Sequence, residues 1–478
     1  MSSSTVLGAR PQAPAPSPAR PSAYQLSVPR DAQARLARGW LWLGLLALIG
    51  AGLFSILLVL SRTPGLNRRF DVAELFRVAL VVHVDLSVLV WFVALAGVLW
   101  TLNGSARAAA WGRAALALCA VGSALMALAP FVGNGKPIMA NYIPVLDGPL
   151  FLAGLLIFGA GSAILVLRSL FTAPRIGAGF DGEGALRFGL NAAAVSAAVA
   201  LAAFAASYVG VPRTLSGKAY YEILFWGGGH ALQFTWTLLM LVGWLWLASA
   251  SGARLPLSPR VTVLMFVLAL AAAFVTPVAY LAYDIASVEH RNMLTLAMRF
   301  GGGVTIVPIG LAVLFGLARV PARLRRWSGP TAPLRAALLA SLLLFAAGGL
   351  IGVVISGSNV RIPAHYHGCI VGVTLALMGL VYHLLPRLGY GTPQGRLATL
   401  QPAVYGVGQL MHIVGLVWSG GYGVQRKVAG AEQVLRSTGE VAGMALMGLG
   451  GAVAIAGGLL FVAVLIRSLR QGAPAGRE

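Results

Sequence analysis

The sequence predicts an all-α polytopic membrane protein, built as a bundle of twelve transmembrane helices. Of its 478 residues, 58% are hydrophobic and only 10% are charged, and the mean hydropathy is +0.83. A water-soluble domain of this composition would expose large apolar surfaces, which argues against a soluble enzyme. Apolar runs of about 17 to 25 residues, long enough to cross a bilayer as a helix, recur along the chain. They cover residues 39–61, 76–101, 111–132, 146–168, 187–211, 219–249, 260–284, 293–318, 332–356, 363–388, 399–419 and 437–467.

Each run is expected to be helical, because a segment in hydrocarbon must satisfy its own backbone hydrogen bonds. The net charge of +22 is spread through the connecting loops, which indicates membrane topology rather than a nucleic-acid partner. We expect both termini to be cytoplasmic, in the inner (plasma) membrane. The chain divides into a disordered N-terminal tail rich in Pro, Ala and Ser (1–38), a membrane domain (39–467) and a C-terminal tail (468–478).

Two histidines lie two residues apart in the span 363–388, within the sequence Pro363–Gly368. An ionisable side chain inside a membrane is costly, so it indicates function. On a helix, positions i and i+2 point roughly 200° apart. His365 and His367 therefore cannot serve one metal, but they can serve two cofactors on opposite sides of the helix.

Two further histidines match the pair in depth. His83 lies in the span 76–101 and His230 in the span 219–249, and both spans run in the same direction as 363–388. All four side chains fall in the first half of their spans, so we expect them to share a layer near the outer face. We interpret His383 and His412 as hydrogen-bonding residues between helices.

A neutral imidazole is a good axial ligand for haem iron. His83 and His367 can clamp one haem on both faces and leave it low-spin. His365 can hold a second, five-coordinate haem, with His230 facing its open side. The alternative for His230 is a packing role.

This arrangement resembles the main subunit of the haem-copper oxidase superfamily, in the branch of cbb-type oxidases and nitric oxide reductases. That family has twelve helices and takes its haem ligands from the second and tenth. The stretch Gly421–Lys427 is similar to the family's Gly-x-Pro-Arg-Arg loop, whose basic pair binds haem propionates. The resemblance implies that Arg426 and Lys427 bind propionates, although an ordinary solvated loop is the alternative. It also implies that His230 is a ligand of a second metal, copper or non-haem iron.

The sequence departs from the family in the seventh span. The family takes two more metal ligands from an adjacent His-His pair there, and this chain reads Phe274–Tyr280 instead. Copper held by one imidazole would be weakly bound, because its nitrogen-rich sites need about three donors. His290 and Glu289 are the best replacement ligands, unless they lie in a solvated loop. Tyr280 and Tyr283 are candidate hydrogen donors in catalysis, or else aromatic anchors at the membrane interface.

The resemblance implies a terminal oxidase, similar to cytochrome c oxidase, in which electrons pass from the low-spin haem to the high-spin haem and reduce dioxygen to water. It further implies a cytochrome c-type or quinol electron donor and accessory subunits. Three alternatives stay open: a nitric oxide reductase, a copper-less haem protein that carries electrons or binds gas, and a secondary transporter that uses the histidines as a proton relay.

Overall fold

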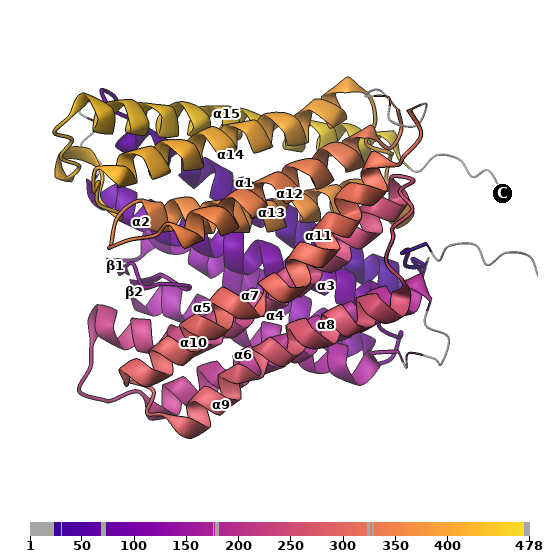
Figure 1. The fold of residues 1–478 in the computed structure, drawn as a ribbon. Helices are drawn as coiled ribbons and strands as arrows, with labels where there is room; N and C mark the ends of the chain where they lie inside the picture. The colour runs from indigo at the N-terminus through magenta and orange to yellow at the C-terminus, as the bar shows by residue number, and fades with distance from the viewer. Residues whose placement is uncertain are drawn as a thin grey trace, which may run out of the picture.

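Among the residues that the structure describes, twelve helical segments are long and apolar enough to cross a membrane, and this confirms the predicted twelve-helix bundle (Figure 1). The structure is a computed structural model that describes residues 23–29, 31–67, 73–174, 176, 181–322, 326 and 329–472. Its elements are α1 (Ala32–Arg62), α2 (Ala73–Val84), the π-helix η1 (Asp85–Val90), α3 (Trp91–Asn103), α4 (Ala109–Val132), β1 (Lys136–Ile138), β2 (Val145–Asp147), α5 (Pro149–Thr172), α6 (Gly182–Gly210), α7 (Gly217–Ala250), α8 (Pro259–Ala273), α9 (Val275–Ala282), α10 (Val288–Gly301), α11 (Gly303–Ala318), α12 (Ala332–Val353), α13 (Arg361–Leu384), the 3-10 turn η3 (Pro386–Leu388), α14 (Arg396–Gly421), the 3-10 turn η4 (Gly430–Glu432) and α15 (Thr438–Gln471).

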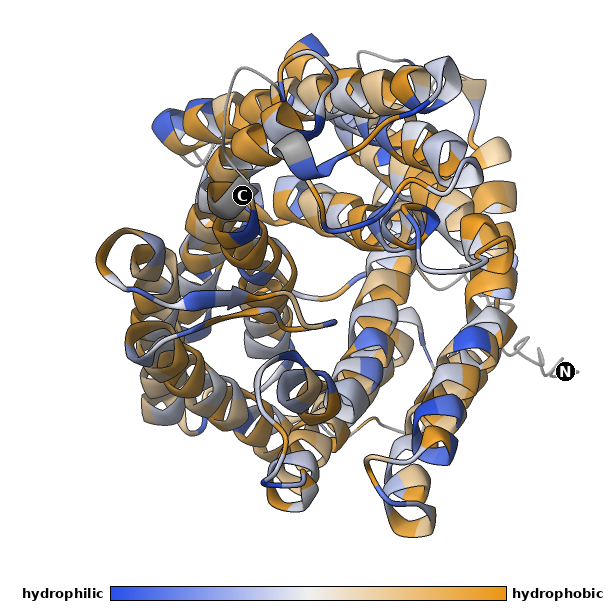
Figure 2. Ribbon diagram, turned by 90° about the vertical axis from the view of Figure 1, so that its left-hand side faces the viewer, coloured by the Kyte–Doolittle hydropathy of each residue, from blue (hydrophilic) through white to orange (hydrophobic). Residues whose placement is uncertain are grey.

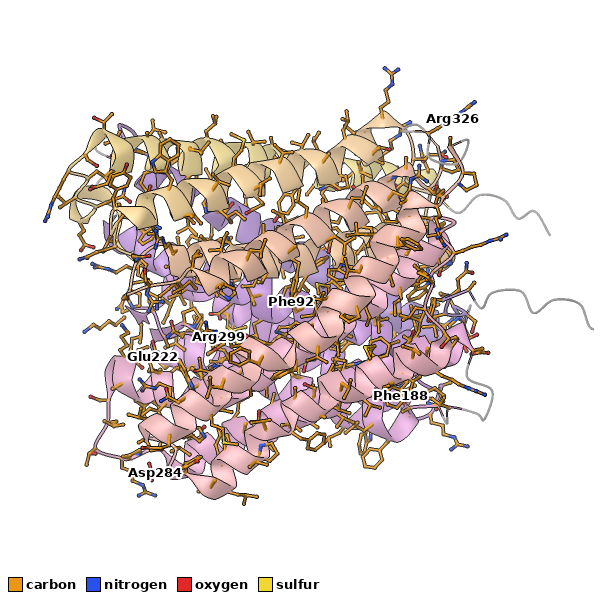
Figure 3. The ribbon with its side chains drawn as sticks, viewed as in Figure 1. Phe92, Phe188, Glu222, Asp284, Arg299 and Arg326 are labelled. Atoms are coloured by element: carbon orange, nitrogen blue, oxygen red, sulfur yellow. The ribbon has the colours of Figure 1, made fainter. Side chains whose placement is uncertain are left out.

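The bundle has two distinct ends. α1 begins and α15 ends on the right in Figure 1, and β1 and β2 form an antiparallel hairpin on the left, which we call the hairpin end. In Figure 3, Glu222 and Asp284 lie toward the hairpin end, Arg326 lies at the other end, and Phe92 lies between them. Figure 2 looks at the hairpin end and shows hydrophobic residues around the helices. This distribution fits a bundle whose middle lies in hydrocarbon.

Part of the tail that was predicted to be disordered is packed against the bundle. Residues 1–22 lie outside the described residues. Tyr24, however, is only 1% exposed, and its hydroxyl donates a hydrogen bond to the carbonyl of Leu257 at 2.8 Å. α1 begins at Ala32 rather than at residue 39, because the Asp31 side chain accepts a hydrogen bond from the N–H of Gln33 and caps the helix.

Two predicted spans are each made of two helices. The break between α8 and α9 comes at Phe274, three residues before Pro277, which has no N–H to bond to the carbonyl one turn earlier. α10 and α11 meet at Gly302. α10 begins at Val288, where Ser287 caps it, so His290 lies in the first turn of a helix and not in a loop.

Small residues let neighbouring helices touch through their backbones. A Cβ added to Gly348 of α12 would lie 2.5 Å from the backbone nitrogen of Cys369 in α13. A Cβ on Gly415 of α14 would lie 2.4 Å from the backbone nitrogen of Met447 in α15. Such contacts are typical of membrane bundles. They fix α13 and α14, which carry four of the histidines considered below.

Candidate functional site

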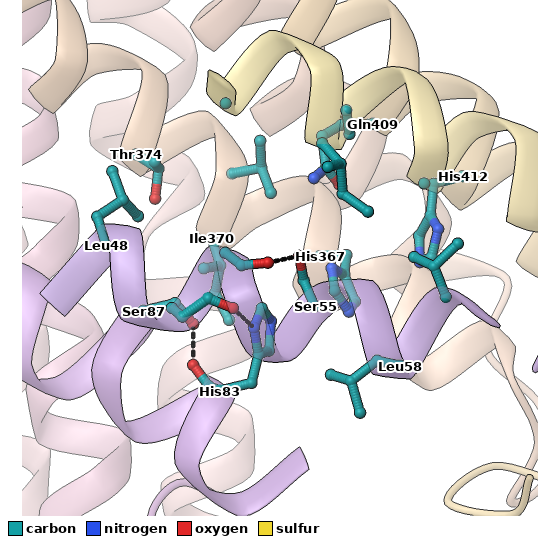
Figure 4. A pocket seen from close by; sticks show the side chains of 18 of the residues that line it. Leu48, Ser55, Leu58, His83, Ser87, His367, Ile370, Thr374, Gln409 and His412 are labelled. Atoms are coloured by element: carbon teal, nitrogen blue, oxygen red, sulfur yellow. Dashed lines mark hydrogen bonds between the residues drawn. The ribbon is translucent and has the colours of Figure 1, made fainter. Parts of the chain in front are cut away.

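A cavity of about 300 Å³ lies among α1, α2, α13, α14 and α15. His83 of α2 and His367 of α13 line it, and Figure 4 shows both rings directed into the same space. His412 of α14 joins them, with its ring centroid 5.1 Å from that of His367. Three imidazoles from three helices therefore face one cavity.

Two of these imidazoles are held by backbone carbonyls. Nδ1 of His83 lies 2.9 Å from the carbonyl oxygen of Ala51, and Nδ1 of His412 lies 3.0 Å from that of Met447. A carbonyl that accepts the Nδ1 proton fixes the tautomer and leaves Nε2 with a free lone pair. The His83 ring is thus prepared to bind a metal through Nε2.

Basic residues line the same cavity at the hairpin end. They are Arg62, Arg426 and Lys427. Lys427 reaches from there to the loop between β1 and β2, where its Nζ donates to the carbonyl of Met139. Burial, together with the positive charge of Arg426, lowers the pKa of Lys427 to about 8. This end of the cavity is suited to an anionic group.

His365 faces the other side of α13, as the spacing of the pair predicts, and it does not line the cavity. Its Nδ1 lies 2.7 Å from the carbonyl oxygen of Gly348 in α12. A Cβ on Gly352 would approach that nitrogen to 2.7 Å, so a small residue is needed there. Like the His83 ring, the His365 ring keeps Nε2 available.

His230 has a different environment. It is 1% exposed, and its Nδ1 donates to the carbonyl of Trp226 at 2.8 Å. Its Nε2 lies 3.0 Å from the hydroxyl of Tyr142, a residue in the loop between β1 and β2. Both ring nitrogens are therefore already bonded.

The remaining predicted residues are only partly brought together. His290 is 2% exposed and packs edge-on against the ring of Tyr280, with centroids 4.7 Å apart. The Tyr280 and Ser207 hydroxyls are 2.6 Å apart. Tyr283 follows the last residue of α9 and is 42% exposed. Among the described residues, no group of three or more His, Cys, Asp or Glu side chains could hold a metal ion.

Sequence reasoning missed two residues. The predicted hydrogen bond from His412 to a neighbouring helix is confirmed, because its Nδ1 lies 3.0 Å from the carbonyl oxygen of Met447 in α15, but the sequence does not predict that His412 lines the cavity beside His367. The signal that could have revealed it is its place near the hairpin end of α14, at the depth of the other histidines. Tyr142 lies between two spans, and no sequence pattern points from that loop to His230.

Comparisons with known proteins agree with this architecture. The family model described as Cytochrome C and Quinol oxidase polypeptide I matches residues 35–454. An uncharacterized protein of Rickettsia prowazekii (strain Madrid E) is 28% identical, over 89% of this chain and 94% of the relative. An uncharacterized protein of Aquifex aeolicus (strain VF5) is 27% identical, over 76% of this chain and 88% of the relative.

A solved structure gives the fold independently. A chain of a heme-copper terminal oxidase dimer superposes with a TM-score of 0.70, covering 94% of this chain and 86% of that chain, at 16% identity. The family match spans most of the sequence, and this structure has the same fold. The chain therefore belongs to the Cytochrome C and Quinol oxidase polypeptide I family and is a membrane protein similar to subunit I of the haem-copper oxidases.

Proposed function

We propose that this chain is a haem-dependent oxidoreductase subunit that reduces dioxygen. In this proposal His83 and His367 would hold a low-spin haem, and His365 would hold a second haem, which would supply the site for reduction of the gas. The observation that carries the proposal is the cavity between His83 and His367, lined by basic residues at the hairpin end.

The residues around this cavity fit a haem. The cavity volume of about 300 Å³ is at the lower end of the range for ligand pockets. The hydrogen bond from His83 to Ala51 leaves Nε2 available, and the cationic side chains of Arg62, Arg426 and Lys427 can pair with two carboxylates. A haem bound by two imidazoles supplies one-electron transfer.

The protein's own residues orient and shield that group. His83 is held by Ala51 on α1, while His367 packs against His412 on α14, so both ligands come from fixed helices. His365 is directed away from this cavity on the same helix. α13 would thus carry one residue for each of the two haems on opposite faces.

The electron donor can be a quinol in the bilayer or a cytochrome c-type protein. Leu53 of α1 and Leu459 of α15 line the cavity, and they are 64% and 65% exposed on the outside of the bundle. A lipid-soluble donor could approach from that side, which favours quinol. We further propose location in the inner (plasma) membrane with both termini in the cytoplasm, and assembly with accessory subunits.

A second candidate is a copper-less haem protein that carries electrons or binds gas. The hydrogen bonds on both nitrogens of His230 favour it, because they leave no lone pair for a second metal. The two candidates differ in turnover, so consumption of dioxygen and of nitric oxide by the purified protein separates them. Nitric oxide consumption without dioxygen consumption would favour a nitric oxide reductase.

The ligand assignment is tested by difference spectra with carbon monoxide. We expect the wild type to bind carbon monoxide, and His365→Ala to lose this binding while keeping the low-spin haem signal. His383→Ala is the matched control, because this histidine lies at the other end of α13, against Trp246. Unchanged carbon monoxide binding in His365→Ala would refute the assignment.

A further inference from the structure

We propose that Tyr142 stands in place of a second metal beside His230, and that this chain binds no copper there. The inference builds on the proposed function, because it concerns the reactive side of the same membrane domain. The tests below give results that do not depend on haem.

The hydrogen bonds of His230 occupy both of its nitrogens. Nδ1 lies 2.8 Å from the Trp226 carbonyl, which has only lone pairs, so the nitrogen must donate its proton. In the neutral ring Nε2 is then the acceptor, and it lies 3.0 Å from the Tyr142 hydroxyl. A metal ion would need the same Nε2 lone pair that this hydroxyl uses.

Tyr142 is suited to remain the donor. Burial raises the pKa of its phenol, and the nearby Glu222 carboxylate raises it further. The phenol therefore stays protonated and keeps its hydrogen for Nε2. Its ring also packs on the imidazole and on Trp226, with centroids 4.9 and 5.9 Å away.

The loop that carries Tyr142 is anchored on both sides. The backbone N–H and the side-chain amide of Asn141 donate to the two oxygens of Glu222 on α7, at 3.2 and 2.9 Å. Lys427 holds the same loop through the carbonyl of Met139 and, at 3.4 Å, through Oδ1 of Asn141. The tyrosine is therefore fixed on His230 by charged residues from two other segments.

The backbone conformation at Tyr142 and the glycine at position 229 both allow the Tyr142 ring to contact His230. Tyr142 has φ +69°, a left-handed conformation that non-glycine residues seldom adopt. On α7, a Cβ on Gly229 would lie only 2.2 Å from Cγ of Tyr142. Gly229 leaves the space that the tyrosine ring fills.

The remaining donors do not complete a copper site. The family's His-His pair is replaced by part of the stretch Phe274–Tyr280. His290 packs against Tyr280, and among the described residues it forms no cluster of three metal-binding side chains with His230. A nitrogen-rich copper site needs about three donors. The residues present therefore do not fit this metal.

Metal analysis of the full-length protein gives the first test. The chain is produced with added copper, and copper, iron and haem are measured per chain in the wild type and in His230→Ala. We expect haem in the wild type, and the same trace of copper in both proteins. About one copper per chain that is lost in His230→Ala would overturn the inference. Absence of haem would instead count against the proposed function.

The hydrogen bond itself gives the second test. With ¹⁵N-labelled histidine in bilayers, His230→Ala identifies the His230 ring signals. Tyr142→Phe should move the Nε2 signal toward that of a free lone pair, whereas Tyr208→Phe, at a residue that is 69% exposed, should not. An Nε2 signal that is the same in wild type and Tyr142→Phe would refute the role of Tyr142, even if copper is absent.

Discussion

The cavity around His367 and the surroundings of His230 lie at the same end of the bundle. They differ in how the histidine nitrogens are hydrogen-bonded and in how much space is left beside the rings. In the cavity, one nitrogen of His83 is tied to a carbonyl and the other stays available beside about 300 Å³ of space. Around His230, the second nitrogen is bonded by Tyr142 and the space is filled by its ring. The hydrogen bonds of the ring nitrogens distinguish His83 from His230, so depth in the membrane alone does not identify a ligand.

The largest expected effect concerns haem binding in the cavity between His83 and His367. His83→Ala or His367→Ala would remove one of the two residues proposed to hold the low-spin haem, whose content per chain should fall by more than about tenfold. The measurement is the haem absorbance per chain after purification.

His412→Ala is the informative companion. Its ring touches His367, but its Nδ1 is bonded to Met447, and we expect the haem to be retained with a shifted spectrum. If His412→Ala lost the haem and His367→Ala kept it, the assigned ligand pair would be wrong.

A substitution at Gly229 tests the close packing of Tyr142 around His230. Gly229→Ala would force a Cβ into the ring of Tyr142, and overpacking of this kind costs about 1–3 kcal/mol. We expect a lower unfolding temperature in detergent and loss of the Tyr142 hydrogen bond. The control is Gly159→Ala, where no atom lies within 4 Å of the added carbon. Equal stability of the two variants would contradict the close packing of Tyr142.

The smallest effect is a pH dependence that links the two regions through Lys427. Its pKa is lowered to about 8, so its positive charge is present below that pH and is lost above it. A nearby cation favours the reduced haem, so the midpoint potential should fall by tens of millivolts, on the order expected for one partly screened charge, as pH rises through the pKa of Lys427, which pairing with the haem carboxylates would raise above 8.

Lys427→Met should lower the haem midpoint potential at neutral pH and abolish its fall with rising pH. Lys136→Met, at an exposed position on β1, should keep it. Arg426, Glu222 and Lys218 are the charged groups that act on Lys427. If the midpoint potential of Lys427→Met changed with pH by the same amount, the change would have to come from the titration of another group.

The sequence predicted the twelve spans and the opposite directions of His365 and His367, because both follow from local periodicity. It could not predict that Tyr142 meets His230, since a contact across 88 residues depends on where a loop folds back. His290 was expected near a loop and is buried in the first turn of α10, because Ser287 caps the helix earlier than hydropathy suggests. Tertiary contacts and helix caps, rather than hydropathy, decided these positions.

The π-helix η1, which begins two residues after His83, has a consequence for evolutionary comparison of this family. A π turn closes hydrogen bonds from i to i+5, so it accommodates one residue more than an α turn. Relatives with an uninterrupted α-helix here should align only with a one-residue gap between His83 and Trp91. An ungapped alignment would rotate every later residue of α3 to the wrong face, and would misassign which substitutions there are tolerated.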